Sequence, residues 1–201
     1  MSNNFNFFSL SIFTYSEMPI FLQAVKDTFR SDFAAGRAIL YADKLKVEKY
    51  FSPEVGGNHD DCFSFWKTMK YPDRIFLSSN SADGRFTLCN VLHLKLNCDF
   101  VLCRMSGEID YPLYDFEYTS ASNESRSILA YKDPKWVFYE SGAPLSFEDL
   151  NLYKNRFIKK RLNNDIIKQY LLQMGVIFEE IDVNVSESYT CIRKIQGRKH
   201  V

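Results

Sequence analysis

The sequence predicts an α+β fold: a predominantly antiparallel, twisted sheet with an N-terminal helix and a C-terminal helical pair packed on it. Apolar and polar side chains alternate through much of Arg74 to Glu140, which is the pattern of half-buried strands. At Ser146 the apolar period changes to about 3.6 residues, the period of an amphipathic helix. Apolar residues make up 46% of the 201 residues, enough for a core without disulfides. We expect about six to eight strands in a single domain over residues 1–201.

The first predicted elements are a strand and a helix. Phe5 to Tyr15 favours a strand, and Ser16 is a suitable N-cap for the helix that follows. Apolar residues of this helix recur at steps of three and four: Met18, Phe21, Leu22, Val25, Phe29 and Phe33. Gly36 ends this pattern, and Ala38 to Tyr41 is a candidate short strand. Lys44 to Phe51 fits either a short helix or an edge strand.

A second helix and a series of strands are expected in the middle of the chain. Asp60 or Asp61 can cap a helix through Phe63, Trp66 and Met69. The pair Asp83-Gly84 suits positive φ and favours a hairpin turn. The expected strands are Arg74 to Ser79, Arg85 to Asn90, Val91 to Leu96, Phe100 to Met105, Leu113 to Thr119, Ser127 to Lys132 and Lys135 to Glu140.

The C-terminal part is predicted to contain two helices and a final pair of strands. Ser146 and Asp149 resemble a capping box at the start of a helix from Phe147 to Leu162. A second helix, Asp165 to Met174, ends at Gly175. Strands are expected from Val176 to Val185 and from Tyr189 to Ile195, before a basic tail, Gln196 to Val201.

The overall charge gives no long-range attraction to nucleic acid or to anionic lipid. Lysine and arginine number 25, as do aspartate and glutamate. The apolar stretch Phe5 to Phe13 is interrupted and lacks a basic flank, so we expect no signal peptide. No stretch approaches the roughly 18 consecutive apolar residues of a membrane span. The five cysteines are irregularly spaced and odd in number, which favours free thiols. We therefore predict a cytoplasmic protein with no membrane contact and leave its oligomeric state open.

Four residues offer the ligand types that zinc prefers: Cys89, His93, Cys98 and Cys103. Their Cys-x3-His-x4-Cys-x4-Cys spacing lacks the tight knuckles of zinc sites. If the segment forms two strands joined at Asn97 and Cys98, alternation places Cys89 and His93 on the opposite side of the sheet from Cys103. A shift of one residue in register would reverse that conclusion. Buried, inert thiols are the simpler interpretation, so we predict no metal and no cofactor, and whether these residues bind metal stays open.

A catalytic centre is not predicted, although the sequence leaves the question of enzyme activity open. The only histidines are His59, His93 and His200, and the chain has neither a Gly-x-Ser-x-Gly elbow nor a phosphate-binding loop. His59 with Asp60 and Asp61 offers acid-base groups, but two aspartates before a helix are more simply explained as caps. A small enzyme built on these three residues remains the third alternative.

Two clusters of charge are candidate binding surfaces. The basic one belongs to the expected helix 147–162 and consists of Lys154, Arg156, Lys159, Lys160 and Arg161. The acidic one lies in the middle strands and their turns and consists of Glu108, Asp110, Asp115 and Glu117, with Glu124 nearby. Each cluster also has the simpler interpretation of a solvated face.

The function we expect is that of a non-enzymatic, cytoplasmic binding protein. Its most plausible form is a bacterial immunity-type inhibitor that binds and neutralises a toxin domain, with the acidic cluster as the partner-binding surface. Such a role needs a rigid, aromatic-rich scaffold with charged surfaces and no catalytic group. The alternative is a protein that binds or processes RNA or another nucleic acid through the basic helix 147–162. The identity of the partner cannot be predicted from the sequence.

Overall fold

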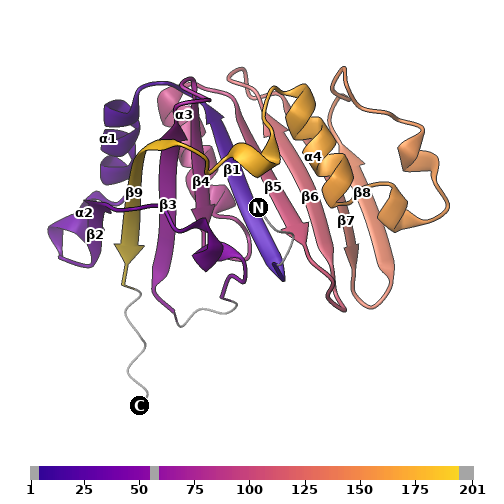
Figure 1. Cartoon of the computed structure of the whole chain (residues 1–201), viewed down its shortest axis with the longest axis horizontal. Helices are drawn as coiled ribbons and strands as arrows, with labels where there is room; N and C mark the ends of the chain where they lie inside the picture. Colours follow the sequence, from indigo (N-terminus) through magenta and orange to yellow (C-terminus); the bar gives the residue numbers. More distant parts are fainter. Residues whose placement is uncertain (1–4, 55–58, 195–201) are drawn as a thin grey trace, which may run out of the picture.

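A computed structural model describes residues 5–54 and 59–194. The predicted basic tail, Gln196 to Val201, lies outside the described residues. The described residues form an α+β fold with one nine-stranded antiparallel sheet, as Figure 1 shows. The strands are β1 (Phe7–Thr14), β2 (Ala38–Ala42), β3 (Asp61–Thr68), β4 (Arg74–Ser79), β5 (Phe100–Ser106), β6 (Leu113–Thr119), β7 (Ser125–Lys132), β8 (Trp136–Ser141) and β9 (Val185–Arg193). Their order in the sheet is β2-β9-β3-β4-β1-β5-β6-β7-β8.

The longer helices lie on both faces of this sheet, and each face is covered over a different group of strands. On one face, α1 (Met18–Thr28) and α3 (Phe86–Leu96) pack over the β9–β5 half with a core that includes Phe13, Phe65 and Leu102; α2 (Arg30–Ala34) follows α1. We call this the α1–α3 face. On the other, the α4 face, α4 (Asn164–Gln173) lies against β5 and β6 over a core that includes Phe8 and Phe116 (Figure 1). Short 3-10 helices lie at η1 (Val47–Tyr50), η2 (Leu152–Lys154), η3 (Ile158–Lys160) and η4 (Phe178–Glu180).

The prediction of a helix after Asp60 and Asp61 is wrong, because this segment forms β3, an interior strand of the sheet. Phe63 and Phe65 are buried on the α1–α3 face, and Trp66 is buried on the α4 face. The Trp66 indole N–H donates to the carbonyl of Ile181 at 2.6 Å. A strand that is buried on both faces shows no alternation of apolar with polar residues, so its chance three-residue spacing resembled a helix.

The prediction of two strands between Arg85 and Leu96 is also wrong, because this segment forms α3. Its buried residues, Leu88, Cys89, Leu92 and His93, follow the helical period, while Leu94 is 64% exposed. Gly84 has a φ of +66°, and a Cβ there would lie 2.7 Å from Leu102 Cδ1. The Asp83 carboxylate accepts a hydrogen bond from the Arg85 N–H at 2.9 Å. Asp83 and Gly84 therefore make a close turn that starts a helix instead of a hairpin.

The C-terminal part confirms one helix of the expected pair and not the other. The prediction of a helix over 147–162 is wrong. Asn155 has an extended backbone, and the helices on either side of it are the short η2 and η3. The second helix is present as α4, where the Asn163 side chain accepts from the N–H groups of Asp165 and Ile166. The strand Val176 to Val185 is replaced by η4 and turns, and β9 begins only at Val185. The N-terminal strand and helix are confirmed as β1 and α1, although Ser16 is not the N-cap.

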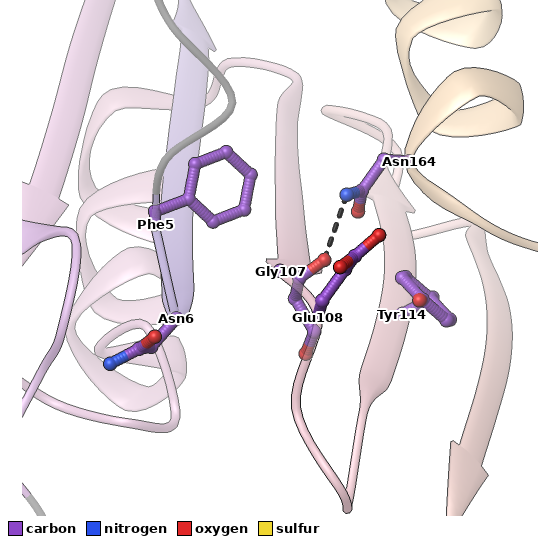
Figure 2. A pocket seen from close by; sticks show the side chains of 7 residues that line it. Phe5, Asn6, Gly107, Glu108, Tyr114 and Asn164 are labelled. Carbon is purple, nitrogen blue, oxygen red and sulfur yellow. Dashed lines mark hydrogen bonds between the residues drawn. The ribbon is translucent and has the colours of Figure 1, made fainter.

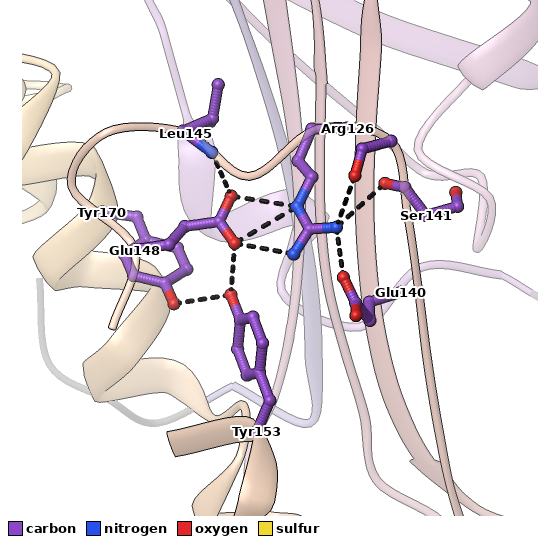
Figure 3. Close-up of polar contacts among 8 residues, drawn as sticks. Arg126, Glu140, Ser141, Leu145, Glu148, Tyr153 and Tyr170 are labelled. Atoms are coloured by element: carbon purple, nitrogen blue, oxygen red, sulfur yellow. Dashed lines mark hydrogen bonds and ion pairs between the residues drawn. The ribbon is translucent and has the colours of Figure 1, made fainter. Parts of the chain in front are cut away.

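A buried ion pair between Arg126 and Glu148 folds the segment after β8 onto the α4 face, as Figure 3 shows. The guanidinium binds both carboxylate oxygens, with Nε to Oε1 at 2.9 Å and Nη2 to Oε2 at 2.7 Å. Arg126 also donates to Glu140 and to the carbonyls of Ser141 and Gly142. Glu148 accepts from the Leu145 N–H and from the Tyr153 hydroxyl. Residues 145–148 form a turn, in which the Glu148 N–H donates to the Leu145 carbonyl at 3.0 Å and the Glu148 side chain is held by Arg126 and Tyr153.

Arg126→Met should destabilise the protein by about 3–5 kcal/mol, because it leaves the Glu148 carboxylate buried without its cation. The double variant Arg126→Met/Glu148→Leu should recover part of this loss, since the buried carboxylate is removed with its cation and the carboxylate that remains, Glu140, is 43% exposed. Urea unfolding monitored by circular dichroism measures both values. A single variant that loses less than about 1 kcal/mol would show that the ion pair does not anchor this segment.

Candidate functional site

The candidate site is the α1–α3 face of β6, β7 and β8, which we call the open face. The helices α1 and α3 pack on the other half of this side of the sheet. The strand register sets Arg104, Asp115, Leu129 and Tyr139 side by side across β5 to β8, which we call the tyrosine row. The next row, which we call the serine row, consists of Leu102, Glu117, Ser127 and Ser141.

Aromatic and aliphatic side chains remain accessible on the open face. Val137 is 38% exposed and Tyr139 is 55% exposed, although both lie in a regular strand of the sheet. Leu129 and Tyr131 beside them are half-buried. Tyrosine on a surface of this kind offers a large apolar area together with a hydroxyl, which is why tyrosine is frequent in protein interfaces. The open face therefore combines apolar area with hydroxyl groups.

A charged cluster lies at the inner edge of the open face. The Arg104 Nε donates to Asp115 Oδ2 at 2.8 Å, and Asp115 is buried. Arg104 Nη2 lies 3.9 Å from Glu117 Oε1, beyond the range of a hydrogen bond. Asp115 Oδ1 is buried, and within the described part of the chain the carboxyl group of Glu117 hydrogen-bonds to the Asp115 carboxylate. One guanidinium thus serves two carboxyl groups, and it pairs closely with only one of them.

This shortage of positive charge determines which carboxyl group keeps a proton. Burial, followed by repulsion from Asp115, raises the pKa of Glu117 to about 8. Burial also raises the pKa of Asp115, but Arg104 opposes that effect through its charge and its hydrogen bond. We therefore assign the shared proton to Glu117, which can donate it to the Asp115 carboxylate. At neutral pH the cluster holds one proton and carries little net charge.

The other two acidic residues predicted for partner binding, Glu108 and Asp110, lie elsewhere, in the β5–β6 loop. Glu108 lines a hollow of about 710 Å³, which Figure 2 shows together with Tyr114 and Asn164. With Asp110 it also lines a neighbouring hollow of about 460 Å³, and this second hollow contains Lys159. The structure therefore divides the predicted acidic cluster between two faces of the sheet.

The five basic residues do not lie on one helix, because only η2 and η3 form in this segment. Arg161 donates to the Asn155 carbonyl at 2.7 Å, and its guanidinium lies 5.3 Å from the centre of the Phe138 ring. The other four, Lys154, Arg156, Lys159 and Lys160, are exposed. Lys159 also lines the hollow that Glu108 and Asp110 line.

The residues considered as zinc ligands are dispersed. Cys89 and His93 lie on α3, whereas Cys103 belongs to the core of the α4 face. The His93 ring bonds to the Cys98 carbonyl at 2.6 Å and to Asn123 Oδ1 at 3.0 Å. Among the described residues, no group of three or more histidine, cysteine, aspartate or glutamate residues is placed to hold a metal ion.

Two residues of the enzyme alternative are engaged in ion pairs. Asp61 Oδ2 lies 2.6 Å from Arg85 Nη2 and 3.2 Å from Arg193 Nη2. His59 Nδ1 lies 3.5 Å from a carboxylate oxygen of Glu54, and His59 is also near enough to act on Asp61. Asp61 therefore belongs to an arginine network at the start of β3, and Glu54 is the closest carboxylate to His59 among the described residues.

Comparison with protein-family models, with curated proteins and with solved structures finds no match to this chain. Within the described ranges, no helix combines the length and the apolar character needed to cross a bilayer. The function must therefore be argued from the surfaces of the protein itself.

Sequence reasoning identified Asp115 and Glu117 but missed Arg104, Tyr131 and Tyr139. The sequence did contain a pattern that pointed to this face: residues of β7 alternate between the two sides of the sheet, and Ser127, Leu129 and Tyr131 lie on the same side. Alternation alone does not show which face a helix covers, and it does not show that Arg104 lies opposite Asp115.

Glu117→Gln should flatten the pH dependence of stability. The pKa of Glu117 is raised in the folded state, so the folded protein binds more protons than the unfolded chain between about pH 4.5 and about 8. Stability is therefore lost as pH rises through this range, by up to about 1.4 kcal/mol per pH unit from this group. The glutamine amide introduced by the substitution cannot ionise but can still donate to Asp115. The stability of the variant relative to the wild type should therefore increase as pH rises.

Urea unfolding at several pH values between about 5 and 8 measures this difference. The control is Glu124→Gln, because Glu124 is an exposed carboxyl group outside the cluster. Parallel pH profiles for the wild type and Glu117→Gln would contradict the assignment of the proton.

Proposed function

We propose that this protein is a non-enzymatic binding protein that recognises another protein through its open face. The observation that supports the proposal is the accessible row of Leu129 and Tyr139 beside the cluster of Arg104, Asp115 and Glu117. Such a surface combines an apolar part with a charged edge, which is the composition of specific protein interfaces. The expected partner class is a toxin domain, in the manner of a bacterial immunity-type inhibitor.

The geometry favours a protein partner over a nucleic acid. Binding to a phosphate backbone needs several cations along one surface. Here Arg161 is bonded within its own segment, and Lys159 lines the same hollow as Glu108 and Asp110. On the open face, Arg104 is already held by Asp115. The RNA alternative assumed one basic helix, but the exposed basic residues are spread over η2, η3 and the segment between them: Lys154, Arg156, Lys159 and Lys160.

The experiment compares two aspartate substitutions at equally exposed apolar residues on opposite faces. Tyr139 on the open face and Leu172 on α4 are both 55% exposed. Tyr139→Asp should weaken partner binding by about 2 kcal/mol or more, because it places a charge in the apolar part of the interface. Leu172→Asp should bind as the wild type does.

Affinity purification from the native cell with each variant, followed by mass spectrometry and calorimetry with the captured protein, measures the effect. Loss of the captured domain's own activity in the complex would support the immunity-type role. Equal binding by Tyr139→Asp and the wild type would contradict the open face as the interface.

A further inference from the structure

The serine row offers space next to the one carboxyl group of the cluster that has no close cation. Ser127 lies directly opposite Glu117, and Ser141 lies opposite Ser127 on the outer strand. In the adjacent tyrosine row the corresponding positions hold Leu129 and Tyr139, which are much larger. A long side chain that enters over the two serines would therefore reach Glu117 with Leu129 and Tyr139 beside it. Directly opposite residues in such a pair lie about 5 Å apart at Cβ.

We propose that this row receives a lysine or arginine side chain of the protein partner, which forms an ion pair with Glu117 and gives the cluster its second cation. This inference rests on the proposed function, because it names the chemistry of the partner at the open face. The supporting observations are the two serines that the strand register places beside Glu117 and the 3.9 Å separation of Arg104 Nη2 from Glu117 Oε1, which leaves two carboxyl groups with one close cation.

Charge balance selects a cation and not an anion as the occupant. Two carboxyl groups share one guanidinium, and Arg104 also attracts Asp83, which precedes α3. Ser127 and Ser141 add no charge from β7 and β8. Aliphatic stems of lysine and arginine pack well on apolar neighbours such as Leu129. A cation also interacts favourably with an aromatic ring such as that of Tyr139. Charge complementarity and packing thus agree on the same type of side chain.

The remaining ionisable groups near Glu117 come from α3, from the turn before it and from β5. On β5, burial, followed by repulsion from Asp115 and Glu117, raises the pKa of the Cys103 thiol and keeps this thiol neutral. Glu117, Asp83 and Arg85 all act on the Cys89 thiol, whose pKa is raised to about 12 by burial. Cys89 therefore stays neutral at physiological pH. Asp83 and Arg85 have opposite charges, so they add little net charge near the cluster. Arg104 and Asp115 remain the groups that act most directly on Glu117.

Binding of the partner's cation should release a proton from the cluster. Glu117 must ionise to form the ion pair, so affinity should rise with pH by up to about tenfold per pH unit below the pKa of about 8. Above that pKa the affinity should become independent of pH, since Glu117 is then ionised before the partner binds.

The first experiment installs the cation in the free protein and needs no partner. Ser127→Lys places an ammonium group opposite Glu117, and Ser127→Met places a side chain of similar length without charge there. Carbon-13 NMR titration of the Glu117 carboxyl group measures the result. We expect Ser127→Lys to lower the pKa of Glu117 from about 8 towards that of an ordinary carboxyl group, and Ser127→Met to leave it at about 8 or higher. An unchanged pKa in Ser127→Lys would overturn the inference.

The second experiment uses the captured partner and separates the two proposals. Calorimetry in two buffers that differ in ionisation enthalpy should show release of up to one proton on binding at neutral pH. Glu117→Gln should bind more weakly at about pH 8 and should release no proton. A partner that binds the open face of the wild type with no proton release would overturn this inference but not the proposed function. A captured partner that is RNA, or the capture of no partner, would overturn both.

Discussion

The buried contact between Arg126 and Glu148 is the constraint on which the β6–β8 half of the molecule depends. It fixes the segment after β8 on the α4 face, where Tyr153 joins the same carboxylate and then the hydroxyl of Tyr170 on α4. One side of these strands is thereby covered while the other stays accessible. In β7 the division follows the strand period of two: Arg126 and Ile128 are buried, and Leu129 and Tyr131 lie on the open face.

The two arginines of this region differ in how fully their charge is compensated. Arg126 binds a fully buried carboxylate in two places, a second carboxylate and two carbonyl groups, so its donors are well satisfied. Arg104 serves Asp115 closely and Glu117 only at a distance, so two carboxyl groups share one close cation. A saturated cluster stabilises a fold, whereas an unsaturated one retains affinity for an added charge. This contrast is our physical reason for assigning a structural role to the first and a binding role to the second.

The sequence predicted those elements whose two faces differ, and it failed where they do not. β6, β7 and α1 show clear periods, because each has one covered and one more polar side. β3 is buried on both sides, so Phe63 and Trp66 carried no strand signal. In α3, alternating leucines imitated a strand, and the turn at Asp83 and Gly84 leads into a helix and not into a second strand. The site was half predictable: Asp115 and Glu117 stand in an alternating strand, but their pairing with Arg104 depends on register.

An uncovered sheet face must avoid non-specific association while it remains able to bind. Here Leu129, Tyr131, Val137 and Tyr139 are interspersed with Ser127, Ser141 and Glu117, so the apolar area is broken by polar side chains. A purely apolar partner would have to cover these groups without supplying hydrogen bonds, which costs free energy. Under the proposed function, a partner with a suitably placed cation avoids that cost and replaces the proton that the carboxyl pair shares. The same carboxyl pair that disfavours indiscriminate contact can therefore select the correct partner, because specificity is a difference between two binding free energies.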